Sequence, residues 1–125
     1  MNENELSAII VYCCFKIHTT LGPGLLESVY ESVLCHELQK RGLRVRKQAV
    51  IPVIYEDMRL EMGFRADIMV EDLVIVEVKS IETIAAVHSK QLLTYLRLCD
   101  MRLGILINFN VALIKDGIKR IVNHL

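Results

Sequence analysis

The segment LVIVEVKS, residues 73–80, gives the clearest indication of the fold. In a β-strand its three valines would point to one face, so that Glu77 and Lys79 would share the opposite face with Ile75. A charged side chain on a buried strand face is costly unless it is paired with another group or holds a metal. The sequence therefore predicts a strand here, and it also predicts a partner that compensates its charged face.

Two helices are expected before this strand, over residues 4–20 and 25–41, because apolar residues recur in both at helical spacing. LGPG (21–24) separates them, and Gly42 ends the second. A two-residue period then predicts strands over 45–55, 59–70 and 73–80, with turns at EDM (56–58) and EDL (71–73). Pro52 marks the first strand as an edge strand or as the position of a bulge.

After the third strand, a helical pattern covers residues 82–99, and GILINF (104–109) is typical of a short buried strand. Asp116-Gly117 predicts the turn of a C-terminal β-hairpin. This order indicates an α/β (α+β) fold, in which helices flank a mixed central sheet. We expect one domain spanning residues 1–125.

Composition narrows the class of protein. The chain has a formal net charge of zero and 53% hydrophobic residues, which disfavours disorder and a broad nucleic-acid-coating surface, and makes a homodimer plausible. No apolar run reaches the roughly 20 residues of a membrane span. MNENELSAII has no basic n-region, so we expect no signal peptide and a cytoplasmic protein. The four cysteines lack paired metal spacing, which favours reduced thiols over a zinc site or disulfides.

Asp67 is the expected partner of the charged face. A three-residue turn at 71–73 would place Asp67 opposite Glu77, whereas a two-residue turn would place it opposite Val76. Two carboxylates about 4 Å apart repel by about 4 kcal/mol at an effective dielectric constant of 20. Mg²⁺ or Mn²⁺ would remove that repulsion, and Lys79 could then contact the attacking water or a scissile phosphate. The alternative is a salt bridge, from Glu77 to Lys79 or from Asp67 to Arg65, on a solvated face.

Two further groups of polar residues are candidates for the site. On the helix at 82–99, His88, Gln91 and Tyr95 fall within about 60° of one another. The alternative is that they have no role in a site: His88 would be a buried histidine whose ring nitrogens are hydrogen-bonded, and Tyr95 a tyrosine whose hydroxyl is exposed. Glu27 lies at the start of the second helix, where an acid is also favoured simply by the helix dipole.

The motifs GFRAD, EVK and QLLTY, in this order, resemble the motif series of the PD-(D/E)XK nuclease superfamily in its RecB-like form. GLLESVY (24–30) resembles the motif of the GxxExxY protein family, a small prokaryotic branch of that superfamily. The resemblance covers nearly the whole chain. It implies the restriction-endonuclease-like αβββαβ core, led by the helix at 25–41.

The resemblance also implies a role for each candidate residue. The metal ligands would be Asp67, Glu77, Glu27 and the carbonyl of Val78. The catalytic residues would be Lys79, Glu77, Asp67 and Gln91. The substrate-binding residues would be Tyr95, His88 and Arg65.

The expected function is a Mg²⁺- or Mn²⁺-dependent nuclease that hydrolyses phosphodiester bonds, in DNA rather than RNA. Such nucleases often need two sites to cut both strands, which again favours a homodimer. Two alternatives are a non-catalytic nucleic-acid-binding or accessory module that uses the same cleft, and a structural or protein-interaction domain. The complete set of acids plus a lysine favours the nuclease, because a pure binder has no need of all three.

Overall fold

The order of helices and strands follows the expected αβββαβ series. A computed structural model describes residues 1–125. Its elements are α1 (Glu3–Leu21), α2 (Glu27–Lys40), β1 (Val45–Tyr55), β2 (Met58–Val70), β3 (Val74–Lys79), α3 (Ala86–Cys99), β4 (Leu103–Asn108), the 3-10 helix η1 (Ile114–Gly117) and β5 (Ile118–Val122). The predicted α+β class and restriction-endonuclease-like core are therefore confirmed.

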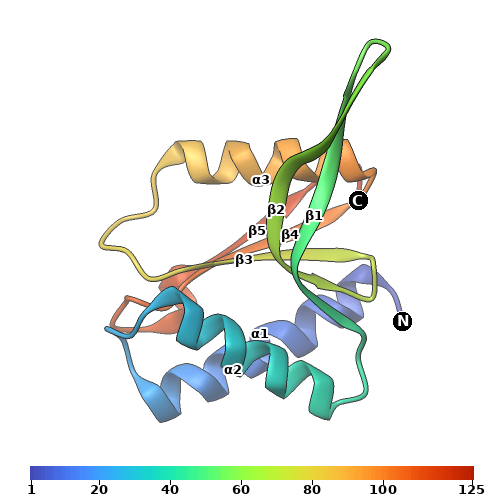
Figure 1. The fold of residues 1–125 in the computed structure, drawn as a ribbon. Coiled ribbons are helices and arrows are strands. Elements are labelled where there is room, and N and C mark those ends of the chain that lie inside the picture. Colours follow the sequence, from blue (N-terminus) through green and yellow to red (C-terminus); the bar gives the residue numbers. More distant parts are fainter.

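The five strands form one mixed sheet in the order β1-β2-β3-β4-β5. β3 and β4 are parallel, whereas the other neighbouring pairs are antiparallel. The parallel pair is joined by α3, since parallel neighbours need a crossover connection. Helices α1 and α2 cover one face of the sheet, and α3 covers the other (Figure 1). None of the three α-helices has the length and hydrophobicity to cross a bilayer.

Two apolar clusters fill the spaces between these layers. Val74, Val76 and Val78 belong to the cluster under α1 and α2. Ile75 belongs to the cluster under α3, with Leu92. The alternation predicted for the third strand is therefore confirmed, and the charged face of β3 looks toward α3.

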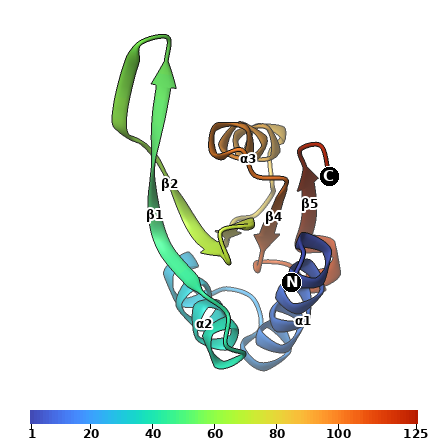
Figure 2. The same cartoon turned by 90° about the vertical axis from the view of Figure 1, so that its right-hand side faces the viewer.

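The first two strands form a long hairpin whose tip extends beyond the rest of the sheet (Figure 2). β1 is an edge strand, and its register against β2 shifts between Ile51 and Val53. Pro52 therefore marks both an edge strand and an irregularity, as expected. We call residues 52–63 the arm; its tip consists of Glu56 and Asp57.

The start of the third helix differs from its predicted position by four residues. α3 begins at Ala86 rather than at residue 82. The preceding loop is held instead by Asn108, whose side chain accepts from the Ile81 N–H at 3.1 Å and donates to the Ile81 carbonyl at 2.9 Å. Contacts with a distant strand thus delay the helix, which local periodicity could not indicate.

The C-terminal hairpin exists, because β4 and β5 pair antiparallel, but its predicted turn is wrong. Asp116 and Gly117 lie in η1, at the end of a longer connection. A Cβ at Gly117 would lie 2.1 Å from the carbonyl oxygen of Asn108. The glycine is therefore required by close backbone packing and not by a two-residue turn.

Candidate active site

The turn between β2 and β3 sets the geometry of the site. Ile68 pairs with Val76 and Val70 pairs with Val74, around a three-residue turn at 71–73. The same register places Asp67 opposite Glu77, as the sequence predicted for a turn of this length.

The two strands separate at Asp67. The β2–β3 ladder ends at Ile68 and Val76, and beyond it the carboxylate of Asp67 accepts from the backbone N–H of Val78 at 2.9 Å. The side chain thus replaces the backbone acceptor that a continued ladder would supply. This hydrogen bond orients one oxygen of Asp67 and leaves the strands parted next to Glu77.

Glu77 is 7% exposed and faces this opening. The pKa of its carboxyl is raised to about 9, first by burial and then by hydrogen bonding with Asp67 and by the charge of Asp67, against the opposing charge of Lys79. Without a cation, Glu77 therefore keeps its proton at neutral pH. A divalent cation would displace that proton and join both carboxylates.

The alternative of ordinary salt bridges is not found. The seven ion pairs include neither Glu77 with Lys79 nor Asp67 with Arg65. Lys79 is half-buried at the end of β3, on the strand face that it shares with Glu77. Its ammonium therefore remains available to another anion near the two acids.

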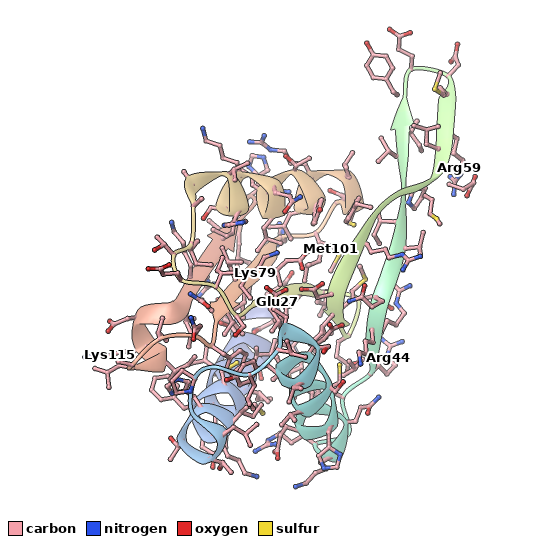
Figure 3. The ribbon with its side chains drawn as sticks, turned by 60° about the vertical axis from the view of Figure 1, so that its left-hand side comes forward. Glu27, Arg44, Arg59, Lys79, Met101 and Lys115 are labelled. Carbon is pink, nitrogen blue, oxygen red and sulfur yellow. The ribbon has the colours of Figure 1, made fainter.

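Glu27 reaches the site from the opposite helical layer. One of its carboxylate oxygens accepts from the backbone N–H of Ser80 at 3.2 Å, directly after Lys79. Figure 3 shows Glu27 and Lys79 between α2 and α3. The first residue of α2 therefore lies against the end of β3, and the second oxygen of its carboxylate has no hydrogen-bond partner.

Tyr30 explains the structural purpose of GLLESVY. Its hydroxyl donates to the carbonyl of Gly22 at 2.6 Å and accepts from the N–H of Leu25 at 3.1 Å. Its ring stacks on Phe109, with the ring centroids 4.4 Å apart. The Ser80 hydroxyl donates to the Leu25 carbonyl at 2.6 Å. The loop before Glu27 is thus tied both to its own helix and to the end of β3.

The candidates on α3 divide into two groups. Tyr95 stacks on Phe64 with ring centroids 3.8 Å apart. Burial raises the pKa of the Tyr95 hydroxyl, the charges of Glu77 and Asp67 raise it further, and a hydrogen bond with Gln91 opposes them. The structure therefore brings Tyr95 and Gln91 to the acidic pair.

His88 and Arg65 are placed differently. The Nδ1 atom of His88 accepts from the Ala85 N–H at 3.0 Å and so caps the start of α3, which leaves Nε2 without a partner. Arg65 pairs with Val50 in the hairpin register and is exposed. Because successive side chains alternate, Arg65 points to the opposite face of the hairpin from Phe64 and from the stacked Tyr95.

Sequence reasoning missed two residues beside the acids. Glu31, one turn after Glu27, is 7% exposed and accepts from the Gln48 side chain at 2.8 Å. Burial raises the pKa of Glu31, against the Gln48 hydrogen bond, and the charges of Asp67 and Glu27 raise it as well. Its i, i+4 spacing from Glu27 was an available signal. Gln48, in a strand far from either acid in the sequence, offered none.

The residues suit a hydrated divalent cation. No three histidine, cysteine, aspartate or glutamate side chains converge to form a closed metal cluster. Mg²⁺ does not require one, because it retains several waters and is commonly held by one or two carboxylates plus phosphate oxygens. Buried Glu77 and half-buried Asp67, whose charge raises the pKa of Glu77, together have the donor chemistry that such an ion fits.

Comparison with known proteins identifies the family of the chain. A family model described as the PD-(D/E)XK nuclease superfamily matches residues 4–121. The searches of the curated proteins and of the solved structures found no match. The family model does not identify a branch, so the resemblance to the GxxExxY family stays a prediction.

Proposed function

This chain belongs to the PD-(D/E)XK nuclease superfamily, and from that premise we propose that it is a metal-dependent nuclease that hydrolyses phosphodiester bonds in nucleic acid, with DNA as the preferred substrate. The observation that supports it most is the pairing of buried Glu77 with half-buried Asp67 where β2 and β3 separate, with Lys79 unpaired on the same strand face as Glu77. A structural domain would have no need of two acids held together at this cost.

Asp67 and Glu77 would hold Mg²⁺ or Mn²⁺, with the carbonyl of Val78 as a further ligand. Because no three acids converge on one point, the free oxygen of Glu27 would contribute through a water bound to the ion. When bound, the ion would activate a water and stabilise negative charge on the phosphate. Glu77 would give up its proton on binding, so the proposal includes metal affinity that increases with pH.

The remaining candidates would act on the substrate. Lys79 would place its positive charge beside the scissile phosphate, since no carboxylate of the chain pairs with it. Gln91 and Tyr95 would orient the phosphate or water above the acids. His88 through Nε2 and Arg65 through its exposed guanidinium would contact the substrate strand farther from the reacting bond. We also propose that the protein forms a homodimer. We further propose that it is cytoplasmic and that residues 1–125 form a single domain.

The test is cleavage of labelled single-stranded, double-stranded and branched DNA, and of RNA, in Mg²⁺, Mn²⁺ or EDTA. We expect metal-dependent cutting that Lys79→Ala lowers by about 100-fold or more, as for the loss of a preorganised charge at a transition state. Lys115→Ala is the matched control, because Lys115 is an exposed lysine in η1.

Two outcomes would contradict the proposal in different ways. Cutting by Lys79→Ala at the wild-type rate would remove the lysine from the mechanism. Mn²⁺ binding in calorimetry without cutting of any substrate would instead indicate the non-catalytic binding module.

A further inference from the structure

In the β1–β2 hairpin, the side chains of both strands exchange faces next to the acidic pair. Residues two apart in a regular strand share a face. In β1, however, Val45 packs in the cluster under α1 and α2, whereas Ala49 packs in the cluster under α3. In β2, Ile68 and Ala66 differ in the same way. Both strands therefore change face within the same few residues.

The change of face centres on Gln48 and Asp67. Lys47 pairs with Ile68 and Ala49 with Ala66, so that Gln48 lies opposite Asp67 in the register. The φ angle of Gln48 is +53°, in the left-handed region. The other non-glycine residues with positive φ lie in turns or outside the strands. Such a conformation costs about 1–3 kcal/mol and persists only where the surrounding structure compensates it.

The side chain of Gln48 connects two acids from different layers. Its Nε2 donates to the Glu31 carboxylate on α2 at 2.8 Å and to Asp67 Oδ1 at 3.4 Å. The other oxygen of Asp67 accepts from the Val78 N–H. Both oxygens of Asp67 are therefore held. The neutral Gln48 amide holds Oδ1 without the competing positive charge that a lysine or arginine would bring to a cation site.

We propose that Gln48 is a positioning residue, whose left-handed backbone turns the hairpin over at Asp67 and whose amide holds Asp67 against Glu31 in the orientation that receives the divalent cation. This inference rests on the proposed metal site. Gln48 is exposed, so its role there differs from that of a buried core residue.

Two variants distinguish the effect of the Gln48 backbone conformation from the effect of its side-chain amide. Gln48→Gly accepts the left-handed conformation and removes the amide, whereas Gln48→Ala removes the amide and retains the backbone cost. Gln39→Ala is the control, since Gln39 is exposed at the end of α2. The measurements are Mn²⁺ affinity by calorimetry, thermal midpoint in EDTA, and cleavage rate against Mn²⁺ concentration.

We expect Gln48→Gly to keep its thermal midpoint within a few degrees and to bind Mn²⁺ about 10- to 100-fold more weakly, the usual effect of losing an outer partner of a metal ligand. Excess Mn²⁺ should restore its cleavage rate, but not that of Lys79→Ala. Gln48→Ala should lose the same affinity and also unfold at a lower temperature.

Wild-type Mn²⁺ affinity in Gln48→Gly would overturn the proposal, because the amide would then position nothing. Absence of Mn²⁺ binding by the wild-type protein would overturn it as well. Wild-type protein that binds Mn²⁺ but cuts nothing would contradict the nuclease alone, since the affinity ratio between wild type and Gln48→Gly would still decide the role of Gln48.

Discussion

At the scale of single residues, Glu77 shows how a charge is accommodated on a buried strand face. Burial and the neighbouring Asp67 raise the pKa of its carboxyl, which favours the neutral form, and Asp67 itself is held by the Val78 N–H. Lys79 lowers the pKa of Glu77 without forming a salt bridge with it. The arrangement is stable as a neutral acid beside a carboxylate, and it becomes costly when both are ionised.

The raised pKa of Glu77 predicts how stability changes with pH. The folded protein holds a proton up to about pH 9, whereas the unfolded chain releases it near the ordinary pKa of 4.5. Stability from this proton is therefore complete below pH 4.5 and is lost as the pH rises toward 9. The free energy of unfolding in EDTA should fall by up to about 1.4 kcal/mol per pH unit in this window.

Urea denaturation at several pH values would check this prediction. Glu77→Gln should flatten most of the slope, with a remainder from Glu31, whose pKa is raised in the same direction. Saturating Mn²⁺ should oppose the loss in the wild-type protein, because binding displaces the proton. An unchanged slope in Glu77→Gln would show that Glu77 is ionised in the folded protein.

At the scale of elements, the start of α2 depends on a side chain rather than on a helix cap. Leu26 precedes the helix and makes no side-chain capping hydrogen bond. The Tyr30 hydroxyl instead satisfies the Gly22 carbonyl and the Leu25 N–H, while Gly24 adopts φ +99° between them. The loop that positions Glu27 is thus held from within α2.

Tyr30→Phe should keep the stacking on Phe109 and lose both hydrogen bonds. Because two backbone groups would lose their partner, we expect the free energy of unfolding to fall by about 1–3 kcal/mol, measured by urea denaturation. Tyr12→Phe is the control, since the Tyr12 side chain is 61% exposed and its hydroxyl makes no hydrogen bond. Equal stability of the two variants would mean that the Tyr30 hydroxyl does not hold the loop.

At the scale of the whole molecule, the arm has one apolar face that nothing covers. Met58, Leu60 and Met62 alternate along β2, and Tyr55 lies opposite Met58, so these four side chains share a face. Each is more than half exposed. Arg59, the one basic residue of the arm, pairs with Glu61, and the tip is acidic, which disfavours a nucleic-acid partner. An uncovered two-stranded ribbon is marginally stable, so we expect the proposed homodimer to cover this face with the same face of a second copy.

The homodimer proposed above should therefore depend on this face. We expect sedimentation of the wild-type protein as a dimer at micromolar concentration, and of Leu60→Glu as a folded monomer. Ile54→Glu is the matched control, because Ile54 is an exposed residue of the same arm that pairs with Arg59 on its other face. A monomeric wild-type protein, or a dimeric Leu60→Glu variant, would contradict the arm as the interface.

Local sequence patterns predicted the order of the main helices and strands and the alternating faces of β3, and they predicted Asp67 opposite Glu77 for a three-residue turn. These features follow from local causes, because periodicity reports burial and the length of a turn sets the parity of the strands that it joins. Pro52 likewise marked the edge and the irregularity of β1, since a proline cannot donate to a ladder.

The contacts between the layers could not be predicted from local patterns. The bridge from Glu31 through Gln48 to Asp67 joins residues from three elements, and the turnover of the hairpin depends on which helical layer each residue packs against. The late start of α3 and the packing of Gly117 also depend on contact with Asn108. Such contacts form between segments far apart in the chain, so local periodicity carries no record of them.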